Sequence, residues 1–124
     1  MANPELVEDG EELIVDLLVT SAYKYVGSGV GITAPVKANA ALESASLPSR
    51  VAGAQSEGTT ASIYKVIATV PYTTTLAITE CGVFDSAGTG NPPSGGILFI
   101  RGTFAAINVV NTDSIQFTIT LEIL

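Results

Sequence analysis

The sequence contains no histidine, no tryptophan and a single cysteine, Cys81. Without histidine there is no Ser-His-Asp triad, no Cys-His pair and no imidazole ligand for a metal ion. A lone cysteine makes neither an intramolecular disulfide nor a zinc cluster, and it is typical of assembly in a reducing cytoplasm. We therefore expect no enzymatic activity, no catalytic residue, no cofactor and no metal site.

Positive charge is scarce, and the five bases are scattered along the chain. They are Lys24, Lys37, Arg50, Lys65 and Arg101. A nucleic-acid-binding protein needs a basic face to neutralise phosphates, so we expect no nucleic-acid partner. Long hydrophobic runs are also missing, because the densest run, Ile97 to Ile100, has four residues. The N-terminus is acidic where a signal peptide would be basic, so we expect neither a signal peptide nor a membrane span.

Negative charge is concentrated at the N-terminus. The net charge is −7, and six of the twelve acids lie in the first sixteen residues: Glu5, Glu8, Asp9, Glu11, Glu12 and Asp16. This cluster lacks the alternating Asp/Asn spacing and central glycine of a calcium-binding loop. It indicates either a solvated helix face or a charged patch that meets a basic neighbour. Glu5, Glu8, Asp9, Glu11 and Glu12 are therefore candidate partner-docking residues.

Length and composition are those of one small domain. We expect residues 1–124 to form a single β-rich domain with an acidic N-terminal segment at about residues 1–20, because 124 residues with 47% apolar side chains suffice for one core. Charged residues make up only 14%, against about a quarter in typical domains. The low fraction of charged residues has two explanations. Either much of the surface is covered by copies of the chain or by a partner, or the chain is simply a β protein rich in Thr, Ser and Gly.

The N-terminal part of the chain predicts one or two short helices. Asn3-Pro4-Glu5 is typical of a helix start, but Gly10 interrupts the stretch. Between Glu11 and Val19, four apolar residues recur at helical spacing opposite acids, and they predict a helix there: Leu13, Ile14, Leu17 and Leu18. Residues 38–47 predict a second short helix that ends before Pro48.

Most of the chain predicts strands joined by turns. Short strands are expected at Ala22 to Val26, Arg50 to Gln55, Ser62 to Val70, Leu76 to Phe84 and Ile97 to Phe104, with a turn-rich loop at Asp85 to Gly96. The clearest strand is Asp113 to Leu124. Its apolar residues alternate with polar ones and should face the core: Ile115, Phe117, Ile119, Leu121 and Ile123. Evenly spaced strands of this kind predict an antiparallel, jelly-roll-like β-sandwich or barrel.

The glycine-rich stretch Gly27-Ser28-Gly29-Val30-Gly31 predicts a loop. Its glycine spacing is not the dinucleotide-binding fingerprint, which has glycines at positions one, three and six between a strand and a helix. No Gly-Lys-Ser/Thr phosphate loop occurs either. We expect a sharply turning connection without a ligand.

Glu80 stands out because of its neighbours. Strict alternation in Leu76 to Phe84 places this carboxylate on the same face as Leu76, Ile78 and Phe84. A carboxylate on an apolar face must be paired or hydrogen-bonded. The structural interpretation is a buried clip between Glu80 and either Arg101 or Arg50. The catalytic interpretation requires a second carboxylate, and the sequence offers no candidate.

Several short segments resemble one family. They occur in the order Tyr25-Val26-Gly27-Ser28-Gly29, Ala41-Leu42-Glu43-Ser44, Arg50-Val51-Ala52-Gly53, Ile78-Thr79-Glu80-Cys81-Gly82-Val83-Phe84-Asp85, Arg101-Gly102-Thr103-Phe104 and Asp113-Ser114-Ile115-Gln116-Phe117-Thr118-Ile119-Thr120. From about residue 11 to the end, the chain resembles the small structural proteins of tailed-bacteriophage virions. Phage fibre and baseplate proteins carry a similar Ile-Thr-Glu-x-Gly-x-Phe-Asp stretch. Cys81 and the longer Asn91-Pro92-Pro93 stretch depart from the common pattern.

The resemblance implies a virion structural protein assembled in the host cytoplasm. A capsid decoration (cement) protein is a compact oligomer, often a trimer, that clamps neighbouring subunits of the major capsid protein. The chain has no fibre shaft and no collagen-like or coiled-coil repeat, which favours this role over a tail-fibre, baseplate or receptor-binding protein. A carbohydrate-binding β-sandwich is a third interpretation. It would require exposed aromatic side chains, and the chain has no tryptophan and four tyrosines.

Overall fold

Alternating apolar and polar residues build the two long strands at the centre of the molecule. β4 (Ile63–Pro71) and β7 (Ser114–Glu122) pair antiparallel without a bulge, from Ile63 opposite Glu122 to Pro71 opposite Ser114. On β4, every second side chain is fully buried, as the period of two requires: Tyr64, Val66, Ala68 and Val70. The expected core face of β7 is confirmed, because Phe117 is buried and the other four apolar residues pack against the core.

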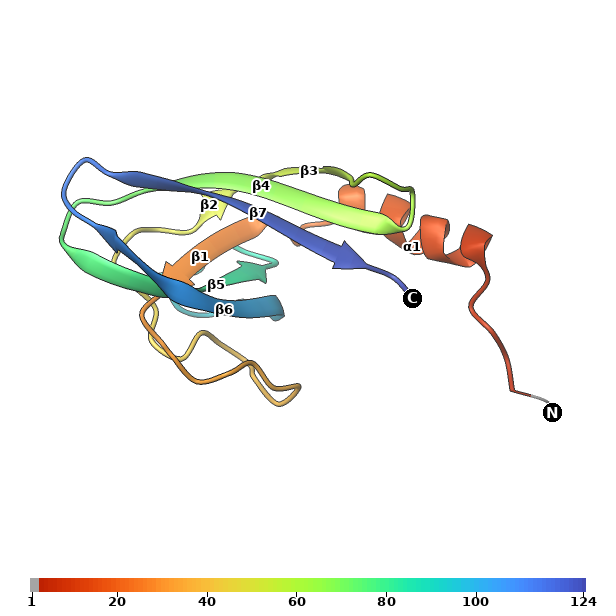
Figure 1. The fold of residues 1–124 in the computed structure, drawn as a ribbon, viewed down its shortest axis with the longest axis horizontal. Helices are drawn as coiled ribbons and strands as arrows, with labels where there is room; N and C mark the ends of the chain where they lie inside the picture. Colours follow the sequence, from red (N-terminus) through yellow and green to blue (C-terminus); the bar gives the residue numbers. More distant parts are fainter. Residues whose placement is uncertain (1–2) are drawn as a thin grey trace.

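Two antiparallel sheets lie face to face (Figure 1). The computed structural model describes residues 3–124, so the first two residues of the expected acidic segment lie outside it. The remaining elements are α1 (Glu8–Val19), β1 (Tyr25–Gly29), β2 (Val51–Ala52), β3 (Ala54–Glu57), β5 (Leu76–Phe84) and β6 (Leu98–Val109). One sheet has the order β2-β1-β5-β6 and the other β3-β4-β7. The mainly β, sandwich-type fold is therefore confirmed.

Two of the passages between the sheets are neighbouring turns that are hydrogen-bonded to each other. The turn after β4 and the turn after β6 meet at Tyr72. Its amide donates to the carbonyl oxygen of Asp113 (2.8 Å), and its carbonyl oxygen accepts from the amide of Thr112 (3.0 Å). This end of the sandwich is therefore closed by backbone hydrogen bonds as well as by the core side chains.

Helix α1 begins at Glu8, three residues before the predicted start, and it includes Gly10. The start expected at Asn3-Pro4-Glu5 is wrong, because residues 3–7 are not helical. Three acids in the first turn favour the actual start through the helix dipole. The predicted apolar stripe is also partly wrong. Val15 is the buried residue and Leu18 packs beside it, whereas Leu13 and Leu17 are exposed.

The stretch expected to be a glycine loop is instead largely strand β1, which pairs with both β2 and β5. Its glycines are explained by side-by-side segments on the outer face of the four-stranded sheet. A Cβ atom at Gly27 would lie 3.2 Å from Cγ of Arg50, and one at Gly29 would collide with the backbone carbonyl of Ser44. At Gly29, glycine is therefore required by close approach of the segment that follows, not by a turn.

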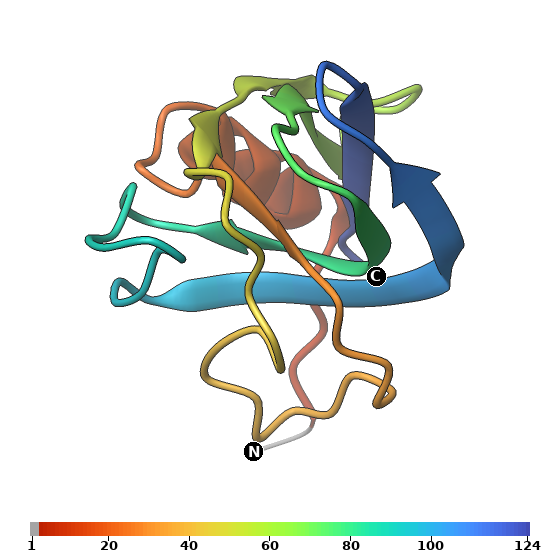
Figure 2. The same cartoon turned by 90° about the vertical axis from the view of Figure 1, so that its left-hand side faces the viewer.

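Residues 30–49 form that segment, and they make a third layer outside the four-stranded sheet (Figures 1 and 2). The helix expected at 38–47 is wrong, because this stretch is irregular. The strand expected at Arg50 to Gln55 is divided at Gly53 into β2 and β3, which belong to different sheets. The strand expected at Ala22 to Val26 begins only at Tyr25. The expected boundaries of β5 agree with the structure, and β6 continues five residues beyond its expected end to Val109.

The face assignment of β7 can be tested with Phe117→Ala. We expect a loss of about 3–5 kcal/mol in the free energy of unfolding, because the buried ring leaves a cavity. Thr118→Ala, on the exposed face of the same strand, should cost less than about 1 kcal/mol. Urea denaturation of both variants measures the difference. Equal losses would contradict the assignment.

Candidate functional site

Glu80 lies on the outer face of the four-stranded sheet, not on the core face. The pairing of β5 with β6 shifts register between Ile78 and Glu80. After this bulge, Cys81 and Val83 join Ile78 in the core, so Glu80 and Phe84 point to the opposite side. The expectation that Glu80 shares a face with Leu76 and Ile78 is therefore wrong, because the bulge inserts one residue into the alternation.

The carboxylate of Glu80 is completely buried and accepts four hydrogen bonds. Oε1 accepts from the amide of Glu43 (2.9 Å) and from Nε of Arg101 (3.0 Å). Oε2 accepts from the amides of Gly31 (2.8 Å) and Ser44 (2.8 Å). Burial alone would raise the pKa of Glu80, but the donors of Ser44, Glu43, Arg101 and Gly31 outweigh it and hold the pKa below its usual value.

Arg101 extends the same network. The structure brings Glu80 and Arg101 together as an ion pair whose side chains are 0% and 3% exposed, and Arg50 lies elsewhere. The guanidinium also donates from Nη1 to Oδ1 of Asn39 (3.1 Å) and from Nη2 to the carbonyl oxygen of Thr33 (2.9 Å). The pair therefore fastens the irregular segment 30–49 to the sheet. It also explains the missing helix at 38–47, since the amides of Glu43 and Ser44 serve Glu80.

Glu43 holds the beginning of segment 30–49 against its later part. Its Oε1 accepts from the amides of Ile32 (2.7 Å) and Thr33 (3.0 Å), and Thr33 also lowers its pKa. Among the described residues, no buried side-chain oxygen or nitrogen lacks a hydrogen-bond partner. This geometry is that of a structural clip. A general acid would need a raised pKa and access to a substrate, and Glu80 has neither.

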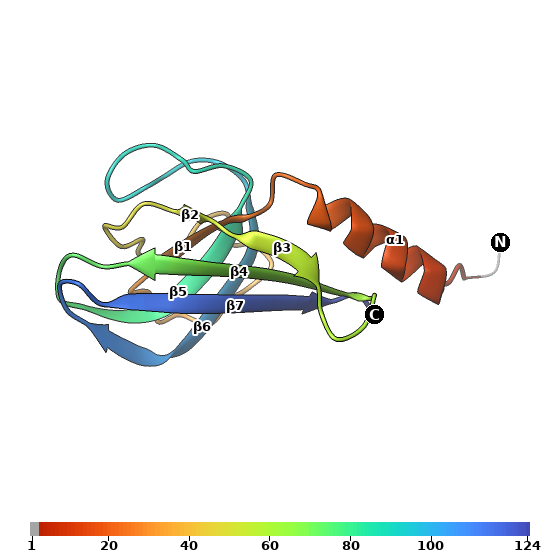
Figure 3. The same ribbon diagram turned by 90° about the horizontal axis from the view of Figure 1, so that it is seen from above.

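The candidate docking residues lie on α1 and the segment before it. Glu5, Glu8 and Asp9 are exposed, and Glu11 and Glu12 are half-buried. Figure 3 shows α1 reaching outward from the end of the sandwich, beside β3 and β4. Leu13 and Leu17, one helical turn apart, are 58% and 62% exposed. The helix therefore presents an exposed apolar strip next to acidic side chains.

One acidic residue of a strand lies next to the acids of α1, and it was not among the residues predicted from the sequence. Glu57, at the end of β3, lies close enough to Asp16 for their side chains to share a hydrogen bond, which raises the pKa of Glu57. Burial and the charges of Asp16 and Glu12 act in the same direction. The signal was not visible in the sequence, because 41 residues separate Asp16 from Glu57. The acidic surface of α1 thus continues onto the sheet at Glu57.

Neither a metal centre nor a membrane-spanning helix is found in the described part of the chain. Within residues 3–124, no three His, Cys, Asp or Glu side chains are grouped so that they could hold a metal ion. Over the same residues, no helix is long and apolar enough to cross a bilayer. Cys81 is buried, and burial together with the charge of Glu80 raises the pKa of its thiol to about 11.

No protein-family model, curated protein or solved structure matches the chain.

Glu80→Gln tests the clip. At pH 7 we expect the free energy of unfolding to fall by about 3 kcal/mol. Arg101 is then buried without its counter-charge, and the NH₂ group of the new side chain faces backbone N–H donors. The folded-state pKa of Glu80 lies below the usual 4.5, so its stabilisation is complete above that value and is lost as pH falls through the folded-state pKa. The difference in the free energy of unfolding between wild type and variant should therefore be smaller at pH 3 than at pH 7.

Urea denaturation at both pH values measures this difference. Glu122→Gln is the matched control, because Glu122 is exposed at the end of β7. It should change the free energy of unfolding by less than about 0.5 kcal/mol. A loss in Glu80→Gln that is independent of pH would contradict the ionised clip.

Proposed function

We propose that the chain is a structural protein of a tailed-bacteriophage virion, acting as a capsid decoration (cement) protein. The observation that carries the proposal is α1, which reaches outward with Leu13 and Leu17 exposed and with acidic side chains on the same helix. Exposed apolar area of this kind marks an interaction surface, and uncompensated charge selects a partner with basic groups. A rigid sandwich with an outward helix suits a protein that works by contact.

Self-association into a homotrimer is the second part of the proposal. Beyond α1, the body also exposes apolar side chains: Ile32, Val36, Ile97, Ile107 and Val110. The body from residue 17 onward carries almost equal numbers of acids and bases, so copies of it meet without strong charge repulsion. Stable interfaces bury roughly 1,200–2,000 Å². The major capsid protein, or another virion protein, would then cover the acidic helix, and neither nucleic acid nor a membrane takes part.

A tail-fibre, baseplate or other tail-associated protein is the second candidate, and one observation favours it. The stretch Ile78 to Asp85 resembles phage fibre and baseplate proteins as well. In the structure these residues serve the fold: Thr79 donates to the carbonyl oxygen of Gly31 (2.7 Å), Glu80 holds the clip, and Asp85 accepts from the amide of Ile97 (2.7 Å). Because these residues serve the fold of this chain, the stretch does not distinguish a head protein from a tail protein.

Electron microscopy of gold-labelled protein on phage particles separates these two candidates. We expect gold over the capsid surface, at many sites on each particle, because a decoration protein follows the capsid lattice. Labelling confined to the tail would replace decoration by the tail-associated role. Particles that take up no label in either place would contradict the virion assignment.

The role of α1 can be tested with Leu13→Ser combined with Leu17→Ser. Both side chains are exposed, so the fold should persist while binding to particles weakens at least about tenfold. Binding of wild type should also fall as salt rises, because exposed charges are screened over about 10 Å at 0.1 M. Co-sedimentation with particles measures both effects.

The matched control replaces two exposed apolar residues that lie outside α1 and outside the apolar set named above, Leu47→Ser with Leu124→Ser. This pair should leave the affinity for particles within about twofold of wild type. Analytical ultracentrifugation shows whether each variant keeps the oligomeric state of wild type. Full binding of the α1 variant would remove the helix from the mechanism.

A further inference from the structure

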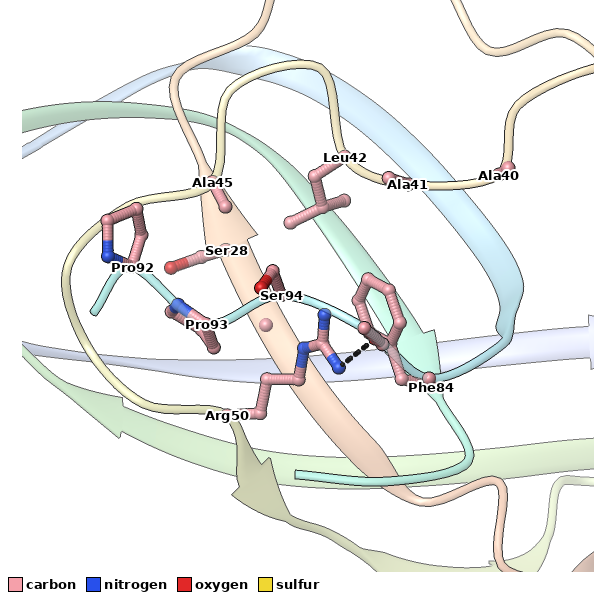
Figure 4. A pocket seen from close by; sticks show the side chains of 13 residues that line it. Ser28, Ala40, Ala41, Leu42, Ala45, Arg50, Phe84, Pro92, Pro93 and Ser94 are labelled. Atoms are coloured by element: carbon pink, nitrogen blue, oxygen red, sulfur yellow. Dashed lines mark hydrogen bonds between the residues drawn. The ribbon is translucent and has the colours of Figure 1, made fainter. Parts of the chain in front are cut away.

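A cavity of about 270 Å³ lies outside the four-stranded sheet, away from α1. Its walls come from β1, from the end of β5 and from the two irregular segments that follow β1 and β5 (Figure 4). The lining is mostly small or apolar, with Leu42, Ala45, Pro92 and Pro93 among the contributors. Arg50 is the one charged side chain in this lining.

Arg50 is held rigidly in the cavity. Its Cζ lies 3.4 Å from the centre of the Phe84 ring, which stacks against one face of the guanidinium. Nη1 donates to the carbonyl oxygens of Ser86 (3.2 Å) and Gly95 (2.8 Å). Gly27 makes room for the side chain, and Arg50 is only 9% exposed. The guanidinium therefore has a fixed position and direction.

Two of its three nitrogens are without a partner. Among the described residues, neither Nε nor Nη2 of Arg50 has a hydrogen-bond acceptor, and neither is sealed from solvent, because no fully buried polar side-chain atom is left unsatisfied. In Figure 4 the guanidinium lies within the ring of lining side chains, with its bonded nitrogen toward Phe84. Nε and Nη2 form the side-on fork that matches the two oxygens of a carboxylate.

No carboxylate of the described chain fills this fork. Asp85 is the acid that acts on Arg50 through its charge, but its Oδ1 accepts from the amide of Ile97 instead (2.7 Å). Within residues 3–124, the ion pair closer than 4.0 Å is that of Glu80 and Arg101. Arg50 is thus a largely buried cation without a close counter-charge, which is costly unless an anion is supplied.

We propose that this cavity binds a carboxylate group carried on a short apolar body. The fork of Arg50 would bind the two oxygens, and Leu42, Pro92 and Pro93 would contact the apolar part. Ligand pockets usually have roughly 300–1,000 Å³, so a cavity of 270 Å³ suits a small group. The site lies apart from the α1 surface and does not depend on the virion assignment.

The first test compares 4-methylpentanoate with 4-methylpentanamide. The two have the same shape, and only the first carries a charge. Isothermal titration calorimetry at neutral pH should show saturable 1:1 binding of the carboxylate and at least about tenfold weaker binding of the amide, since hydrogen bonds between two charged groups are stronger than those to a neutral one. Equal affinities, or no binding of the carboxylate at tens of millimolar, would overturn the proposal.

A second test blocks the cavity without changing Arg50, whose replacement would also release the segment 85–96. Ala41 is exposed and lines the cavity, so Ala41→Phe should fill it and abolish binding of 4-methylpentanoate. Ala77→Phe is the matched control, because Ala77 is exposed on β5 and outside the lining. It should bind like wild type. Unchanged binding in Ala41→Phe, or equal loss in both variants, would overturn the placement of the site.

The carboxylate can come from a free small molecule or from an acidic side chain of a neighbouring subunit. Analytical ultracentrifugation in saturating 4-methylpentanoate distinguishes them. If the natural occupant is a side chain of a second copy, the free carboxylate competes with it and lowers the mass of the oligomer. If the natural occupant is a free carboxylate, the mass is unchanged. Both results support the same carboxylate chemistry in the cavity.

Discussion

The buried carboxylate of Glu80 is the constraint on which the outer half of the molecule depends. An ionised group with no solvent contact must have its oxygens fully occupied, and three of its four donors are amides and one is Arg101. Three of these donors belong to the segment 30–49, so ionisation and the path of that segment are coupled. Once the segment lies on the sheet, glycine is required beneath it, at Gly29 against Ser44. One charge therefore explains a loop without regular structure and a strand rich in glycine.

Residues of the stretch Ile78 to Asp85 position most of the side chains that hold the outer segments on the sheet. The bulge after Ile78 turns Glu80 outward, while Cys81 and Val83 return to the core. At its end, Phe84 supports the guanidinium of Arg50. These roles concern the interior of the fold. The partner must be specified by residues outside this stretch.

The sequence pattern was sufficient to predict those elements whose structure depends on neighbouring residues in the chain. The strict alternation in Ile115 to Ile123 predicts both the strand and its buried face, because the period of two is a property of the strand itself. The glycines of β1 and the irregular stretch at 38–47 could not be predicted, since their causes are contacts with Arg50, Ser44 and Glu80, which are distant in sequence. The Glu80–Arg101 pair was foreseeable as a need for a counter-charge, but the bulge that sets its face was not. The open fork of Arg50 could not be predicted either, because it depends on which carbonyl groups, distant in sequence, accept from Nη1.

The two arginines beneath the outer segments show how the same side chain takes two roles. Arg101 uses all three nitrogens, on Glu80, Asn39 and Thr33, and the carboxylate of Glu80 neutralises its charge. Arg50 uses only Nη1, on the carbonyl oxygens of Ser86 and Gly95. Stacking on Phe84 fixes its position without occupying its remaining donors, because the ring contacts the face of the guanidinium and not its edge. A cation that is fixed, largely buried and without a close counter-charge is prepared for an anion from outside, whereas one paired with a buried carboxylate serves the fold.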